Sequence, residues 1–206
     1  VHGRNFLTGV ATDSHRLSSS SVEIENTNNF SSLILPRKAV YQLCSLLSES
    51  NEKFSMQTSE NKVKFNLGSI KLISKVIDGK FPDYKKVVPN DNKKFLVVPS
   101  KDFINSIERV ASVSLDRKEG VKLSINKENI QLSVNSVSSG EGNEIIKADF
   151  NSDNFNISFN SKYLIDIISE VEDRNLKMNL KDSVSPVLIE DASDKNSYYV
   201  IMPMKI

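Results

Sequence analysis

The stretch PSKDFINSIERVASV, residues 99–113, precedes an alternating run that extends from Val121 to Val134. Apolar side chains in the first stretch recur three and four positions apart, as on one face of a helix, with Ser100 as the expected N-cap. The run that follows alternates apolar and polar residues on both sides of a polar turn at 126–129. Together they predict a helix followed by an antiparallel hairpin with one buried face.

The same unit recurs twice more along the chain. A helical pattern at 36–48 precedes a hairpin at 54–67, and another at 160–171, with Ser161 as the expected N-cap, precedes a hairpin at 176–189. Further strands are expected at 6–12, 20–25, 69–76, 144–150, 155–159 and 198–202, with a Ser- and Gly-rich loop at 136–143. We predict an α+β fold with amphipathic helices on one face and antiparallel sheets on the other.

The organisation into domains follows from residues 82–94, which contain two prolines and several charges and resemble a linker. This predicts an incomplete domain at 1–89 and a fuller one at 90–206. The N-terminus, Val1-His2-Gly3-Arg4, has no signal-peptide character and no initiator Met, so we expect an upstream part to be missing.

Composition narrows the class of protein. The charges nearly cancel, with 27 Lys+Arg against 26 Asp+Glu and a net charge of +1, so bulk electrostatics does not indicate nucleic-acid binding. The single cysteine, Cys44, excludes an internal disulfide and a Cys-based zinc cluster, and we expect it to be a small core residue. No apolar run approaches the length of a membrane span, so we expect a cytoplasmic protein without membrane contact.

Catalytic chemistry has weak support. Asp13-Ser14-His15 invites comparison with a hydrolase, but three consecutive side chains diverge and no Gly-x-Ser-x-Gly motif is present. The seven glycines are scattered, which argues against a phosphate loop, and no metal-ligand spacing stands out. We therefore expect no catalytic residue, cofactor or metal; a hydrolase using Ser14 and His15 remains the enzyme alternative.

The C-terminal run YVIMPMKI, residues 199–206, is apolar, whereas chain ends are normally polar unless something holds them. Such an end is either buried in a sheet or lines an apolar groove. Its two Met side chains repack easily and suit a groove that accepts several partners. This favours a docking surface.

Five motifs carry a family resemblance: ATDSHRL at 11–17, PRK at 36–38, DGKFPDY at 78–84, DSVS at 182–185 and VIMPM at 200–204. In order and spacing they resemble the bacterial DNA polymerase III beta subunit, the sliding clamp. The resemblance implies the DNA-clamp fold of three similar domains, of which this chain holds most of the second and all of the third.

What the resemblance implies about function is a processivity factor without enzymatic activity. Two full-length subunits close into a ring around duplex DNA, held without sequence specificity. A groove between the second and third domains docks linear peptides of the polymerase III alpha subunit, clamp-loader subunits, other polymerases and repair proteins. The remaining alternative is a generic β-rich adaptor without a DNA role.

The resemblance also implies site residues, position by position. The groove would be lined by Thr12, Ser14, His15, Arg16, Leu17, Pro82, Lys86, Val87, Asn160, Tyr163, Val184, Pro186, Val200, Ile201, Met202, Pro203, Met204, Lys205 and Ile206. Arg37, Lys38, Lys101 and Arg109 would face DNA, and Ser112 and Val113 would contact the neighbouring subunit of a full-length dimer. Two departures stand out: Ser14 occupies a position where Gly is common, and the tail ends Lys-Ile where Arg-Leu is common.

Overall fold

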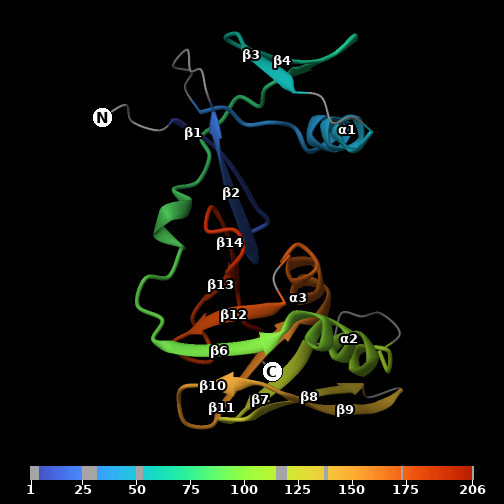
Figure 1. Cartoon of the computed structure of the whole chain (residues 1–206), viewed down its shortest axis with the longest axis vertical. Helices are drawn as coiled ribbons and strands as arrows, with labels where there is room; N and C mark the ends of the chain where they lie inside the picture. Colours follow the sequence, from blue (N-terminus) through green and yellow to red (C-terminus); the bar gives the residue numbers. More distant parts are fainter. Residues whose placement is uncertain are drawn as a thin grey trace. The chain divides into compact units, whose positions relative to one another are not determined.

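The computed structural model describes residues 5–24, 32–49, 53–114, 120–136, 139–172 and 174–205 (Figure 1). The chain divides into two compact units. Residues 1–24 and 85–206 form the larger unit, and residues 25–84 form the smaller one. Each is described by itself below.

The larger unit contains a seven-stranded antiparallel sheet in the order β1-β2-β14-β13-β12-β6-β10. Its strands are β1 (Asn5–Thr12), β2 (Arg16–Ile24), β6 (Lys94–Pro99), β10 (Asp149–Phe150), β12 (Asn175–Leu180), β13 (Val187–Asp191) and β14 (Ser197–Ile201). Strand β14 pairs with β2, which places Val200 opposite Leu17 and Ile201 opposite Arg16. The N-terminal hairpin is therefore built into the same sheet as the C-terminal strand.

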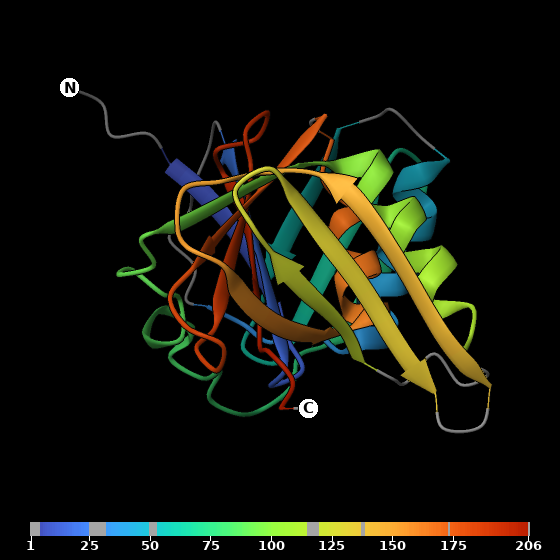
Figure 2. The same cartoon turned by 90° about the horizontal axis from the view of Figure 1, so that it is seen from below.

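A second, four-stranded sheet and two helices complete this unit. The sheet has the order β11-β7-β8-β9, so β9 lies at an edge. The elements are α2 (Ser100–Ala111), β7 (Gly120–Ile125), β8 (Asn129–Ser136), β9 (Gly140–Lys147), β11 (Phe155–Asn160) and α3 (Ser161–Ile168). Seen from below, β7, β8 and β9 run side by side with α2 behind them (Figure 2).

One hydrophobic core joins both sheets and both helices of the larger unit. Phe103 of α2 and Leu164 of α3 are fully buried in the same cluster as Leu123, Leu132 and Met178. Burying a side chain of this size stabilises the fold by about 1.5–3 kcal/mol. The core thus holds α3 and β11 firmly at the places where they carry the candidate site.

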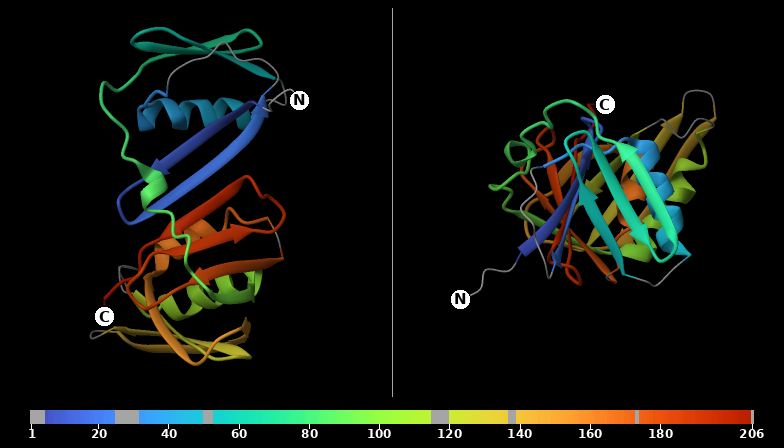
Figure 3. Two further views of the ribbon diagram at one scale, coloured as in Figure 1. Left: turned by 90° about the vertical axis from the view of Figure 1, so that its left-hand side faces the viewer. Right: turned by 90° about the horizontal axis from the view of Figure 1, so that it is seen from above.

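The smaller unit packs one helix on a three-stranded sheet, as the left panel of Figure 3 shows. The elements are α1 (Arg37–Ser48), β3 (Phe54–Thr58), β4 (Lys62–Leu67) and β5 (Ile70–Lys75), with the sheet in the order β3-β4-β5. Val63, Phe65 and Leu67 are buried against half-buried leucines of α1. The 3-10 helix η1 (Tyr84–Lys86) spans the boundary of the two units in the sequence.

The expected α+β class, the three helices and the three hairpins are confirmed. The expected caps are wrong. Pro99 precedes α2, whose Ser100 N–H donates to the Arg174 carbonyl at 2.8 Å. Asn160 caps α3, because its side-chain oxygen reaches the Tyr163 N–H at 3.1 Å.

Two local expectations also fail. Cys44 is exposed, because α1 turns Leu43, Leu46 and Leu47 towards the sheet instead. In the expected loop at 136–143, β8 extends to Ser136 and β9 begins at Gly140; residues 137–138 lie outside the described residues.

Candidate functional site

The turn between β1 and β2 is a closed hydrogen-bond network. One oxygen of the Asp13 carboxylate accepts the N–H groups of His15 and Arg16, each at 3.0 Å. The Thr12 hydroxyl donates to the Arg16 carbonyl at 2.8 Å. Burial acts to raise the pKa of Asp13, but these N–H donors and the Arg16 guanidinium outweigh it and hold that pKa below its ordinary value. The turn is therefore fixed by an ionised carboxylate.

Ser14 lies at the tip of this turn with a φ of 74°. This is the left-handed region, where a Cβ costs energy and glycine does not. The backbone thus explains why glycine suits this position. The Ser14 N–H donates to the Thr12 hydroxyl at 3.3 Å, which keeps the turn closed despite the strain.

Arg16 joins the turn to helix α3. Its Nη1 lies 2.6 Å from an Asp166 carboxylate oxygen and its Nε 3.0 Å from Asp13. Its Cζ lies 4.3 Å from the centre of the Tyr163 ring, a cation–π contact. Burial acts to lower the pKa of Arg16, but hydrogen bonds to Asp166 and Asp13 outweigh it and raise that pKa. His15 stacks on the same Tyr163 ring, with centroids 6.1 Å apart.

The C-terminal tail is bonded to the same turn. The Met202 N–H donates to the His15 carbonyl at 2.8 Å, and the Met204 N–H donates to the backbone carbonyl of Ser158 in β11 at 2.7 Å. Val200 and Ile201 are buried in the sheet, as is Leu17, so these three form the floor beneath the tail. Met202 is 39% exposed, and Pro203 and Met204 are half-buried. The tail therefore begins as a sheet strand that ends at Ile201 and continues as an apolar segment with Met202 exposed.

The remaining expected groove residues lie on other segments of the chain. Val87 and Val184 are exposed apolar side chains on loops of the larger unit, close in sequence to exposed Lys86 and half-buried Pro186. Asp182 holds the loop of Val184 by accepting its N–H at 2.9 Å. Pro82 belongs to the smaller unit. Lys205 is exposed, and Ile206 lies outside the described residues.

Asp166 was not anticipated from the sequence, although a signal existed. It lies three positions after Tyr163 on α3, so the two side chains share a helical face. His15 lacks the acid that a hydrolase requires: within the described residues, no carboxylate hydrogen bonds to its imidazole, because Asp13 and Asp166 are engaged elsewhere.

The basic residues expected to face DNA have different surroundings. Arg109 on α2 pairs with Glu144 of β9 through its Nη2 and through its Nε at 3.0 Å. Hydrogen bonding to Glu144 raises the pKa of Arg109, and the same bond lowers the pKa of Glu144. In the smaller unit, Arg37 lies over Tyr41 and donates to its hydroxyl at 2.9 Å. Lys38 and Lys101 are exposed.

The residues expected at the dimer contact lie at the end of α2. Ser112 is the C-cap, and its hydroxyl donates to the Arg109 carbonyl at 2.7 Å. Val113 packs against the core. The neighbouring edge strand β9 approaches α2 closely, since a Cβ on Gly142 would lie 2.8 Å from the Val110 carbonyl oxygen. The end of α2 and the edge strand β9 therefore lie against each other.

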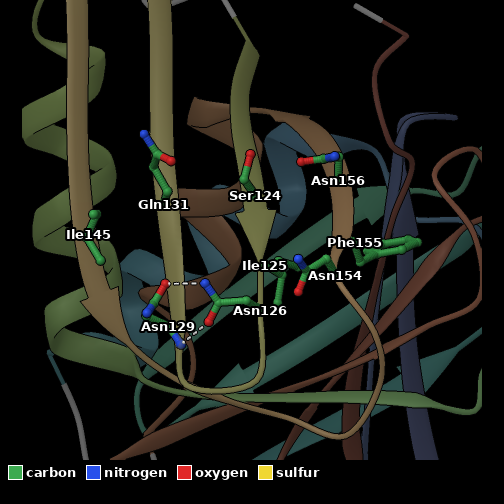
Figure 4. Close-up of a pocket in the computed structure, with 9 residues that line it drawn as sticks. All are labelled: Ser124, Ile125, Asn126, Asn129, Gln131, Ile145, Asn154, Phe155 and Asn156. Atoms are coloured by element: carbon green, nitrogen blue, oxygen red, sulfur yellow. Dashed lines mark hydrogen bonds between the residues drawn. The ribbon is translucent and has the colours of Figure 1, made fainter.

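Two hollows lie away from the turn and tail. The one in Figure 4 has a volume of about 300 Å³ and is lined by Ser124, Ile125, Asn126, Asn129, Gln131, Ile145, Asn154, Phe155 and Asn156. The other, of about 410 Å³, lies between the start of α2 and the end of α3 and includes Lys101. Among the described residues no cluster of His, Cys, Asp and Glu suits a metal ion. Nor has any described helix the length and apolar character of a membrane span.

Comparisons with known proteins place this fold in the class of DNA polymerase sliding clamps. A profile described as DNA polymerase III beta subunit, C-terminal domain, matches residues 85–205, and one described as its central domain matches residues 2–83. The chain belongs to the bacterial DNA polymerase III beta subunit family, the beta sliding clamps.

The relatives agree in sequence and in structure. The beta sliding clamp of Caulobacter vibrioides is 34% identical over 99% of this chain, and that of Escherichia coli is 32% identical over 97%; each match spans 55% of the relative. The chain therefore spans about half the length of these relatives. The crystal structure of the sliding clamp from Bartonella birtlesii bound to griselimycin matches with a TM-score of 0.94 at 38% identity, covering 100% of this chain and 56% of that one. A Caulobacter crescentus sliding clamp matches with a TM-score of 0.93 at 34% identity, covering 99% and 55%.

Proposed function

We propose that this chain is the partner-docking part of a DNA polymerase processivity factor. The full-length subunit pairs with a second copy, encircles duplex DNA and tethers polymerase, so its gain is one of effective concentration and involves no catalysis. The observation that carries the proposal is the bonded network that joins the 12–16 turn, α3 and the apolar tail. It presents exposed thioether and aromatic surface on a rigid support, as a peptide-docking site requires.

The docking surface has its centre at Met202, Pro203 and Met204, flanked by His15 and Tyr163. The Arg16 guanidinium lies over the Tyr163 ring, and the buried Leu17, Val200 and Ile201 support the surface from below. The related clamp with bound griselimycin supports a ligand-accepting surface in this family. The partners are linear segments of polymerase III alpha, clamp-loader subunits, other polymerases and repair proteins, in the cytoplasm.

The assignments of the domains, the subunit contact and the DNA-facing residues rest on the family and on where the elements lie. We assign residues 1–89 to the second clamp domain and 90–206 to the third. Among the described strands β9 lies at a sheet edge, and together with Ser112 and Val113 it suits contact with a neighbouring subunit, because an edge strand offers free backbone groups. Lys101 and Lys38 are the better candidates for DNA phosphates; Arg109 is already paired with Glu144.

A peptide titration tests the docking function. A pentapeptide with Leu and Phe anchors is expected to bind the 206-residue chain with micromolar affinity, about −8 kcal/mol or weaker. Deleting residues 202–206 should abolish binding, with a loss well above the ~1 kcal/mol that separates hot spots from neutral contacts. Calorimetry measures both, and circular dichroism checks that the sheet remains folded.

A matched pair of substitutions controls for general loss of apolar surface. Met202→Ala and Ile145→Ala each truncate an exposed apolar side chain of the larger unit. Only the first should weaken the peptide. Undiminished binding by the tail-deleted chain would show that the docking surface lies elsewhere.

A further inference from the structure

The guanidinium of Arg16 is shared between two carboxylates from distant parts of the sequence. Asp13, in the same turn, lies 3.0 Å from its Nε, and Asp166, 150 residues further on, lies 2.6 Å from its Nη1. Two carboxylates around one guanidinium leave one uncompensated negative charge at the edge of the proposed docking surface. Arg16 therefore does not offer a free positive fork to an acidic partner.

The two carboxylates are not equivalent. Asp13 also accepts two backbone N–H groups, so the turn itself compensates part of its charge. Arg16 is the one polar partner that the Asp166 side chain has within the described part of the chain. Both carboxylates are 43% exposed and Arg16 is 28% exposed, so an approaching ligand meets the Asp166 charge directly.

We propose that Asp166 determines the charge preference of the docking surface: it occupies Arg16, repels a peptide carboxylate at that end, and leaves recognition to the apolar anchors. This inference rests on the proposed docking function. The physical reason is that a like charge placed beside the ligand disfavours acidic partners more than neutral ones, which makes it a specificity element.

The test compares two peptides on four proteins. Pentapeptides with Leu and Phe anchors carry either Asp or Asn at the same non-anchor position, each such position being tried in turn. Their affinities are measured by calorimetry at low salt for the parent chain, Asp166→Asn, Asp166→Glu and Asp153→Asn. Asp153 lies on an exposed bend between β10 and β11, so its substitution removes one charge without touching Arg16.

At a peptide position close to Asp166, the parent should bind the Asn peptide more tightly than the Asp peptide. In Asp166→Asn the Asp peptide should gain roughly three- to tenfold over the Asn peptide at one position or more, the scale of one charge acting within a few ångströms of partly exposed surface. The gain should shrink as salt rises, because exposed charges are screened. Asp166→Glu keeps the charge and should keep the parent ratio, as should Asp153→Asn.

Each contrary result has a distinct meaning. If both peptides bind but Asp166→Asn leaves their ratio unchanged at every position, the inference is overturned and the docking function stands. If both weaken equally, Asp166 only positions Arg16, and the inference is again overturned. If the parent binds neither peptide, the proposed function itself fails, and the inference with it. Asp166→Ser carries the same expectation as Asp166→Asn and replaces it if thermal unfolding shows that the latter is not folded.

Discussion

In the larger unit, single aspartate side chains accept hydrogen bonds from backbone N–H groups that have no partner in a sheet or helix. Asp13 organises the β1–β2 turn, and Asp191 does the same at the end of β13. One oxygen of Asp191 accepts the N–H and hydroxyl of Ser193 at 2.8 and 2.5 Å, and the other accepts the Glu172 N–H at 2.9 Å. Both carboxylates act through their charge, so their effects depend on pH.

Ser14→Gly should stabilise the protein. The φ of 74° costs a residue with a Cβ about 1–2 kcal/mol, and glycine removes that cost. Part of the gain is lost because glycine gives the unfolded chain more freedom, about 0.5–1 kcal/mol. We expect a net increase of roughly 0.5–1 kcal/mol in the free energy of unfolding, measured in urea. Ser18→Gly, in the middle of β2, is the control and should destabilise; a loss of stability in Ser14→Gly would contradict the strain argument.

Asp191→Asn should destabilise the protein at neutral pH by about 1–3 kcal/mol, because the donors of Glu172 and Ser193 lose an ionised acceptor that is itself buried. Burial acts to raise the pKa of Asp191, but the Ser193 hydroxyl and the backbone donors outweigh it and lower that pKa. A depressed pKa contributes stability above the unfolded value of about 3.9, and the contribution is lost as pH falls through the folded value. Urea unfolding of parent and variant should therefore differ fully at pH 7 and progressively less below about pH 4. A difference that stays constant with pH would rule out the ionised form as its source.

At the scale of elements, the edge strand β9 is held by α2. Arg109 and Ser106 of α2 both bond to Glu144 of β9, and Gly142 lets the strand approach the helix backbone. The geometry of the proposed subunit contact therefore depends on how α2 and β9 pack together.

Gly142→Ala should destabilise the larger unit by roughly 1–3 kcal/mol, because the added Cβ would lie 2.8 Å from the Val110 carbonyl oxygen and backbone must shift. Gly9→Ala is the matched control, since a Cβ there meets nothing within 4 Å and should be neutral or slightly stabilising. Thermal unfolding of the two variants measures the contrast. Equal effects of the two substitutions would show that β9 has room to move.

At the scale of the whole molecule, charge and topology limit what these 206 residues do by themselves. The net charge is +1, and Arg109, Arg16 and Lys181 are each paired with a carboxylate. In the proposed function a closed ring retains DNA by topology, and contacts to phosphates are weak.

The 206-residue polypeptide should bind duplex DNA weakly and in a salt-dependent way. Non-specific affinities run at roughly 0.1 mM to 1 μM even for proteins that hold DNA directly. Fluorescence anisotropy on a short duplex at increasing salt measures this affinity. The affinity of Lys101→Ala is compared with that of Lys127→Ala, which removes another exposed lysine of the same unit. Binding that persists at high salt would indicate a direct DNA site and contradict the topological mechanism.

The local elements could be predicted from the sequence because their signals are local. Helical spacing gives α1, α2 and α3, and alternation around polar turns gives the three hairpins, since one face of each must be buried. The tail was correctly placed as an apolar segment held by the fold. The family motifs, matched in order, identified the class of protein.

Only the tertiary structure decided which distant residues meet. The β2–β14 pairing, the Arg16–Asp166 ion pair and the stacking of His15 on Tyr163 join residues about 150 or more positions apart, and no local pattern encodes such contacts. The same holds for the cap of α3: Ser161 and Asn160 are both good N-cap residues, and the backbone leaving β11 selects Asn160. Local periodicity follows from the geometry of one element, whereas the site depends on how the elements pack around a common core.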